Sequence, residues 1–256
     1  MIKCKSCGSL TDYKGESHCP NCREEYTVTP IEATDMMKEA RAAMKSRDFD
    51  TARENIHFLA NRGVLDAERE YGAMLERGKL LPKDLDLASR YYLSAARKND
   101  PYSAYKYSCL TAKLDEKTSS FWLAYAALLG EKAAFPKAAE MYRHMGDEDT
   151  ATFYYSIAAA CDDAHAIVTM AKRHYNGIGA LQSEELARWY MDRLTFPPIY
   201  ALRLKFILRG VEAKEPPRPV FVHRDAILRR LCRDAERMGF AEARLKLTRL
   251  LSENSD

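Results

Sequence analysis

One helical pattern occurs three times in this chain, and it limits the possible fold more than any other feature. Two full copies share an aspartate, three alanines and two tyrosines, at Asp84, Ala88, Tyr91, Tyr92, Ala95 and Ala96 and at Asp147, Ala151, Tyr154, Tyr155, Ala158 and Ala159. A shorter copy, thirty-six positions before the first, keeps Asp48, Ala52, Ile56 and Ala60. Spacings of three, four and seven place these residues on one face of an α-helix. The repeated unit is therefore a helix whose buried stripe alternates small with large side chains.

Single helices of this kind cannot bury their apolar faces alone, so successive units are expected to stack into an α-solenoid. Beyond Pro30 no stretch shows the alternation of a strand, and the prediction is an all-α fold. Prolines that helices tolerate in a first turn stand at Pro82, Pro101 and Pro136. Glycines suited to helix ends stand at Gly63, Gly78, Gly130, Gly146, Gly177 and Gly210. A Pro-rich loop is predicted over 211–222.

The stretch from Ala67 through Gly72, Gly78 and Pro82 to Ala96 resembles a Sel-one-like repeat (SLR), a relative of the tetratricopeptide repeat (TPR). A looser copy runs from Ala164 to Tyr190, so the clearest repeats are 65–100 and 163–195. The tail from Gly239 to Leu247 resembles the start of a further unit, whereas the segment from Tyr107 to Phe135 fits poorly. The resemblance implies a curved surface that holds partner segments or nucleates protein complexes.

Within such a repeat, small and aromatic residues have complementary packing roles. Gly72 and Ala88 are expected on facing helices, where small side chains allow backbones to approach to about 8–10 Å. The tyrosines of the pattern are expected to fill the wedge between hairpins, with their hydroxyls at the rim: Tyr91, Tyr92, Tyr154 and Tyr155.

The first thirty residues have a different character, because they hold four of the seven cysteines. Cys4, Cys7, Cys19 and Cys22 form two Cys-x-x-Cys pairs separated by eleven residues, which is the spacing of a tetrahedral zinc site. Four thiolates close the coordination, so the expected single Zn²⁺ is structural rather than catalytic.

Residues 1–30 are therefore predicted to form a zinc ribbon, with short strands at 10–13 and 26–28. Arg23 stands where a glycine often follows the second cysteine of such a pair. Disulfides would suit an exported protein, but only three residues precede Cys4, too few for a signal peptide. These features favour a reducing, cytoplasmic location.

Other groups that could carry chemistry have simpler structural interpretations. The Gly177–Gly179 segment follows a helix and lacks a third glycine, which indicates an inter-helix loop rather than a nucleotide site. Asp163, near Cys161 and His165, aligns with Asp100 at a helix junction and is expected to cap the next helix. Two isolated cysteines are interpreted as small core residues, Cys109 and Cys232. No catalytic residue and no organic cofactor is predicted.

Charge narrows the possible partners. Forty basic and 37 acidic residues give a net charge of +3, and the basic residues of the cysteine segment are matched by acidic ones, unlike a segment that grips phosphates. Near the C-terminus, Arg230, Arg233 and Arg237 form a basic stripe opposite an apolar stripe that contains Leu231. A solvated face is the simpler interpretation, and a contact for an acidic protein segment is the alternative.

The sequence thus predicts a bacterial, cytoplasmic protein with a zinc ribbon at 1–30 and an SLR/TPR-like α-solenoid at 31–256. Its expected function is non-enzymatic protein–protein interaction, as a scaffold or adaptor. The runner-up is a nucleic-acid- or transcription-associated factor that reads through the ribbon, and a third hypothesis is an enzyme with its site in the poorly matched central segment. A membrane partner is not expected, and the oligomeric state is left open.

Overall fold

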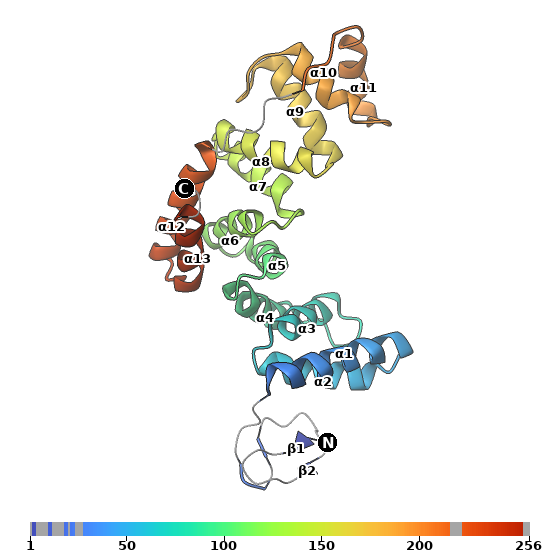
Figure 1. The fold of residues 1–256 in the computed structure, drawn as a ribbon, viewed down its shortest axis with the longest axis vertical. Coiled ribbons are helices and arrows are strands. Elements are labelled where there is room, and N and C mark those ends of the chain that lie inside the picture. Colours follow the sequence, from blue (N-terminus) through green and yellow to red (C-terminus); the bar gives the residue numbers. More distant parts are fainter. Residues whose placement is uncertain are drawn as a thin grey trace. The chain divides into compact units, whose positions relative to one another are not determined.

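The computed structural model describes residues 2–3, 10–11, 18–19, 21–23, 28–215 and 222–252. These residues contain thirteen helices and one sheet of two short strands (Figure 1). The chain divides into two compact units, Met1–Thr111 and Ala112–Asp256. The boundary falls inside the segment that matches the repeat pattern poorly, between Tyr107 and Phe135. The all-α prediction is confirmed for the body of the chain.

The first unit consists of consecutive helices in which each packs on the next. In chain order its elements are β1 (Ile2–Lys3), β2 (Leu10–Thr11), α1 (Pro30–Ser46), α2 (Phe49–Asn61), α3 (Leu65–Arg77), α4 (Leu85–Arg97) and α5 (Pro101–Thr111). The first helix begins at Pro30, next to the predicted boundary between zinc ribbon and solenoid. That division into two domains stays a prediction.

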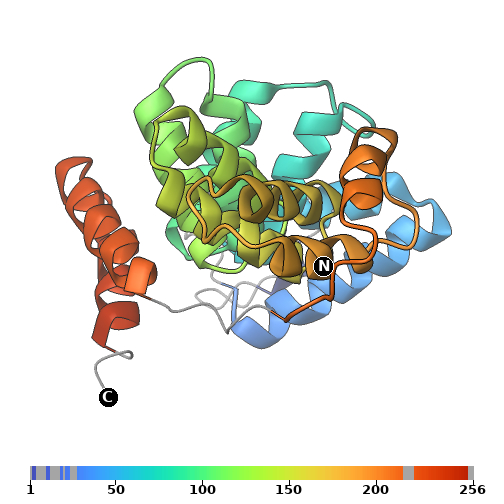
Figure 2. The same ribbon diagram turned by 90° about the horizontal axis from the view of Figure 1, so that it is seen from above.

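The second unit repeats this arrangement over α6 to α10 and then departs from it. Its elements are α6 (Glu116–Leu128), α7 (Ala134–His144), α8 (Glu148–Ala160), α9 (Ala164–Asn176), α10 (Glu184–Asp192), α11 (Ile199–Ile207), α12 (Val222–Arg237) and α13 (Ala241–Ser252). The last two form a hairpin (Figures 1 and 2). Helix α12 also packs against α6 and α8. The helices therefore do not all stack in chain order.

The aspartate that opens each copy of the pattern is a helix N-cap. Asp48, Asp84 and Asp147 each accept a hydrogen bond from the backbone N–H three residues later, at 3.2, 2.9 and 3.1 Å. Asp163 caps α9 in the same way at 2.8 Å, as predicted. Since the first N–H groups of a helix lack partners within it, these carboxylates fix where the helices begin.

The core of each hairpin is built from the repeated alanines and tyrosines. Ala88 and Tyr92 are fully buried in α4, and Ala151 and Tyr155 occupy the same places in α8. The nearest neighbour of Gly72 is the Tyr92 ring rather than Ala88, because a Cβ on Gly72 would lie 3.1 Å from that ring. The glycine therefore makes room for an aromatic side chain.

Tyrosine hydroxyls reach polar partners at the rim in three of the four predicted cases. Tyr91 donates to Asn61 Oδ1 at 2.7 Å, Tyr92 donates to Glu76 Oε2 at 2.8 Å, and Tyr155 donates to Glu140. The expectation was wrong for Tyr154, whose hydroxyl is buried without a hydrogen-bond partner among the described residues. Its ring stacks on Tyr142 with centroids 5.5 Å apart, and this packing replaces the rim position.

Two further sequence interpretations need correction. Cys109 is exposed rather than part of the core, and Cys232 is only half-buried, because each lies on the outward edge of its helix. The predicted strand at residue 10 exists as β2, but it pairs antiparallel with β1, with Lys3 opposite Leu10. Val28 lies in no strand, and the rest of the predicted partner strand lies outside the described residues.

Candidate functional site

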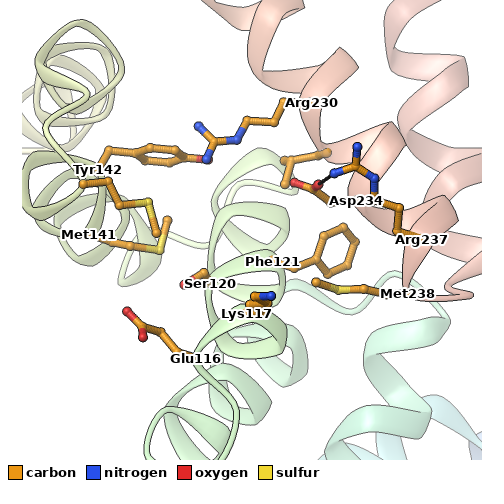
Figure 3. Close-up of a pocket in the computed structure, with 12 residues that line it drawn as sticks. Glu116, Lys117, Ser120, Phe121, Met141, Tyr142, Arg230, Asp234, Arg237 and Met238 are labelled. Carbon is orange, nitrogen blue, oxygen red and sulfur yellow. Dashed lines mark ion pairs between the residues drawn. The ribbon is translucent and has the colours of Figure 1, made fainter.

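Three helices of the second unit enclose a cleft of about 450 Å³, which we call the α6–α7–α12 cleft (Figure 3). Its walls combine apolar with charged side chains. The apolar lining residues are Phe121, Met141, Tyr142, Met145, Leu231 and Met238. The polar ones are Glu116, Lys117, Ser120, Arg230, Asp234 and Arg237.

The position of α12 in this cleft follows from its apolar stripe. Leu228, Leu231 and Ala235 are at most 2% exposed, so the stripe expected from the sequence is confirmed. Phe240, in the turn before α13, stacks on Phe121 of α6 with ring centroids 5.2 Å apart. Aromatic contact and aliphatic burial together hold the α12–α13 hairpin on α6.

The apolar part of the cleft is formed by rigid rings and flexible thioethers. Phe121 and Tyr142 are each 3% exposed, whereas Met145 is 48% exposed at the opening. Methionine side chains are unbranched and polarisable, so they adapt to different partners more readily than branched side chains do. Such a lining suits an apolar side chain inserted by another molecule.

Arginines extend across the cleft from α12. The Arg230 guanidinium lies 5.5 Å from the centroid of the Tyr142 ring, and its Nη1 is 3.6 Å from Asp147 Oδ2. Arg237 Nη1 lies 3.8 Å from Asp234 Oδ1. Arg233 is exposed and does not line the cleft. The predicted stripe is thus divided, because only Arg230 and Arg237 face the apolar floor.

The lining of the cleft contains two hydroxyl groups, those of Ser120 and Tyr142, beside its charged side chains. Burial raises the pKa of Tyr142 to about 12, so its hydroxyl stays protonated at neutral pH; the nearby Arg230 works against this shift, and Asp147 and Asp234 add to it. Ser120 is the only hydroxyl nucleophile besides Tyr142 among the twelve lining residues, and none of these residues is a histidine or cysteine. The lining therefore lacks the imidazole and thiol groups that often serve as base or nucleophile.

A second concave surface lies in the first unit, where α1, α2, α3 and α5 enclose about 540 Å³. Its lining residues are Met44, Ile56, Arg69, Glu70, Ala73, Met74, Arg77 and Tyr102. Several of its charged groups are already paired, since Arg69 binds Asp66 and Asp100, and Arg41 binds Glu70. We therefore regard the α6–α7–α12 cleft as the stronger candidate.

The predicted zinc ligands are only partly described. Cys4 and Cys7 lie outside the described residues, whereas Cys19 is 1% exposed and belongs to the same apolar cluster as Ala33 and Met37 of α1. Cys22 is exposed.

The backbone around the second cysteine pair forms a closed turn. Arg23 N–H donates to the Cys19 carbonyl with an N···O distance of 2.7 Å. Arg23 has φ of 58°, the left-handed conformation for which glycine is favoured. Arg23 therefore adopts, at the position where glycine often stands, a backbone conformation that glycine takes more readily.

Sequence analysis missed the apolar half of the cleft. Phe121 and Met141 lie in or near the poorly matching segment, and Met238 follows α12 just outside the repeat pattern. The one available signal was the aromatic cluster of α6, which also contains Trp122 and Tyr125.

Comparison with solved structures defines the class of protein. The chain is similar to a Sel1 repeat protein from Oxalobacter formigenes, with a TM-score of 0.57 and 19% identity over 69% of this chain and 80% of that one. It is also similar to a protective antigen of uropathogenic Escherichia coli strains that displays an SLR fold, with a TM-score of 0.57 and 17% identity. That match covers 85% of this chain but 48% of the antigen.

These likenesses, with the stacked hairpins described above, show an α-helical repeat protein with the SLR fold. No protein-family profile matches the sequence, and no curated protein sequence matches it. In the part of the chain that the structure describes, no helix is long and apolar enough to cross a bilayer.

Proposed function

We propose that this protein is a non-enzymatic scaffold or adaptor that binds a segment of a partner protein in the α6–α7–α12 cleft. The observation that carries the proposal is the combination of an apolar floor with arginines at its edge, held between helices from distant parts of the chain. Interfaces of this composition, with aromatic, methionine and arginine side chains, are typical of protein recognition. SLR-like folds present such surfaces without needing a catalytic centre.

The cleft favours a partner segment that carries both apolar and acidic side chains. An apolar side chain would displace solvent from Phe121 and the methionines, and a carboxylate would meet Arg230 and Arg237. Because Asp147 and Asp234 already lie near these arginines, the charge contribution is expected to be smaller than the apolar one.

Two matched methionine variants test this assignment. Met145→Asp places a charge at the mouth of the cleft, and Met44→Asp places the same charge at the surface of the first unit, where the methionine is 37% exposed. In affinity capture from the native host, Met44→Asp should retain the partner that the original chain captures. Met145→Asp should weaken the affinity for that partner about tenfold, which corresponds to about 1.4 kcal/mol of binding free energy. Equal capture by both variants would remove the cleft from consideration.

Charge reversal tests the basic stripe separately. Arg237→Glu should weaken capture of that partner a few-fold, whereas Arg233→Glu, on the exposed face, should leave it unchanged. Melting temperatures should stay within a few degrees for both, since exposed charges contribute little to folding. Stronger loss with Arg233→Glu would move the contact to the outer face of α12.

The second part of the proposal is a structural zinc ion bound by Cys4, Cys7, Cys19 and Cys22. Two observations support it: the closed turn at Cys19–Arg23 and the antiparallel pair β1–β2, which places Lys3 opposite Leu10 on either side of the first cysteine pair. Four thiolates at this spacing suit a tetrahedral Zn²⁺ ion. The ion would hold a short segment that has little apolar core of its own.

Elemental analysis tests the metal. One zinc per chain is expected in protein purified under reducing conditions, and a Cys4→Ser/Cys19→Ser variant should lose it. Cys109→Ser/Cys161→Ser, which changes two exposed thiols outside the set, is the control and should keep the metal. Undiminished zinc in the first variant would contradict the ligand assignment.

We place the protein in the cytoplasm, because a four-thiolate site requires reduced cysteines. The alternative, a nucleic-acid-associated factor that reads through the cysteine segment, predicts salt-dependent retention on DNA. Retention that is lost in the Cys4→Ser/Cys19→Ser variant would favour this alternative over the scaffold.

A further inference from the structure

Helix α11 carries an apolar face that no other described part of the protein covers. Ile199, Leu202 and Phe206, at i, i+3 and i+7, form one stripe along the helix and are 88%, 49% and 69% exposed. Phe196, just before the helix, is 91% exposed. We call these four residues the α11 face. The opposite side is buried through Ala201 and Leu204, so the helix itself is anchored in the second unit.

This exposure is unusual for the fold. A helix that is apolar on all sides is normally buried on all sides. In the repeats, α3 is covered by α4, α7 by α8 and α9 by α10. The next helix after α11 is α12, which instead packs against α6, α8 and α13 (Figure 1). Of the helices that the structure describes, none packs on α11 as extensively as α4 packs on α3.

The charged residues of the segment that contains α11 are all basic. From Arg193 to Val211 the sequence contains no aspartate or glutamate. Arg203 and Arg209 are exposed, and Lys205 donates to the Leu194 carbonyl at 2.9 Å. Arg209 also lies 5.4 Å from the centroid of the Phe206 ring. None of these three cations forms an ion pair with a described residue, whereas Arg193 is bound to Asp162 at 2.6 Å.

This charge decides between the possible occupants. The chain's own α12 is a poor one, because its apolar stripe is already buried and its outer surface carries arginines such as Arg229 and Arg233. A second copy of α11 is also a poor one, because Arg203, Lys205 and Arg209 would face identical cations. The α11 face is therefore best matched by an anionic partner that carries an apolar stripe.

We propose that the α11 face binds an amphipathic helix of a partner protein, whose apolar stripe covers Ile199, Leu202 and Phe206 and whose acidic edges face Arg203 and Arg209. The partner helix takes the place that the second helix of a repeat occupies elsewhere in the chain. A helix is favoured over a flat surface because i, i+3, i+7 stripes pack best against a matching helical ridge. This inference rests on the proposed scaffold function and adds a second binding surface with a defined partner chemistry.

Selection from a displayed library of helical peptides, with the full chain as target, tests the proposal. Enriched peptides should be amphipathic with acidic residues flanking the apolar stripe. Their affinity should fall at least tenfold with Phe206→Asp, with Ile199→Asp and with Arg203→Glu. Because all three residues are exposed, circular dichroism should show unchanged melting. The controls Leu114→Asp, at a residue 81% exposed outside this face, and Arg233→Glu should bind the peptides like the original chain.

Four outcomes would overturn the proposal. The first is a library selection that enriches no peptide, and the second is one that enriches only peptides that bind the α11 variants equally well. Sedimentation with phosphatidylcholine–phosphatidylglycerol vesicles that is lost in Phe206→Asp would assign the face to an anionic membrane surface. Sedimentation velocity that shows a dimer abolished by Ile199→Asp would assign it to a second copy. The cleft is tested independently, because Met145→Asp should leave peptide binding at α11 intact while reducing partner capture.

Discussion

At the scale of single residues, Gly179 has the least free space among the glycines that the structure describes. It lies in the loop after α9, where a Cβ would approach Thr152 Oγ1 at 2.8 Å and the Glu148 carbonyl at 2.9 Å. The same space holds the guanidinium of Arg173, which is 5% exposed and binds Glu148 Oε2 at 2.6 Å. The glycine pair that resembles a nucleotide loop in sequence therefore makes room for an ion pair whose arginine is buried.

Comparing two glycines separates this close approach from backbone strain. Gly179 and Gly146 both have positive φ, 58° and 77°, but a Cβ on Gly146 would meet nothing within 4 Å. Gly146→Ala should lower the free energy of unfolding by about 1–2 kcal/mol through strain alone. Gly179→Ala should lower the free energy of unfolding by about 1–3 kcal/mol more than Gly146→Ala does, because the added methyl group also overpacks its surroundings. Urea denaturation measures both, and equal losses would mean that the Arg173 cluster shifts freely.

At the scale of elements, the repeated aspartates decide where helices begin. Asp84 accepts the Leu87 N–H at 2.9 Å, while Asp86, two residues later, is exposed and caps nothing. Asp84→Ala should reduce the free energy of unfolding by about 1 kcal/mol, and Asp84→Asn should restore most of it because the amide oxygen also accepts. Asp86→Ala should lower the free energy of unfolding by only about a few tenths of a kcal/mol, because it removes only a favourable interaction with the helix dipole. Thermal denaturation that ranks Asp86→Ala as the more damaging change would contradict the capping role.

Local sequence patterns predicted the elements well, because caps, glycine ends and buried stripes depend on neighbouring residues. Asp163 is a cap as expected, and Gly63, Gly78 and Gly177 have the positive φ of helix ends. The cleft was not predictable in this way. Arg230 faces Tyr142 only because α12 packs on α6 and α8, and no local pattern defines where a helix far along the chain docks. Because α12 packs on α6 and α8, it also leaves the α11 face uncovered.

At the scale of the whole molecule, neighbouring helices make most of the packing contacts, and the chain divides into two compact units. Stability in such a repeat protein is approximately a sum of local contributions. A destabilising substitution in one repeat should therefore affect mainly that repeat and its neighbours.

Gly72→Leu tests this locality. A side chain at residue 72 would press on the buried Tyr92 ring, which lies 3.1 Å from the Cβ position. The substitution should destabilise by about 1–3 kcal/mol. Hydrogen exchange should accelerate in α2 to α5, while amides of α8 to α10 keep their protection. Uniform acceleration along the chain would show one cooperative unit instead.

The central claim is that the α6–α7–α12 cleft holds a segment of a partner protein. Site-specific photo-crosslinking in the native host tests it most directly, with the photoreactive residue at Ser120 inside the cleft and a control at Asp50, whose side chain is 82% exposed on α2. The account predicts a discrete protein adduct from position 120 that disappears in the Met145→Asp background. It predicts no such adduct from position 50. A cleft that yields no adduct, while the same partner is still captured by the full chain, would contradict the account.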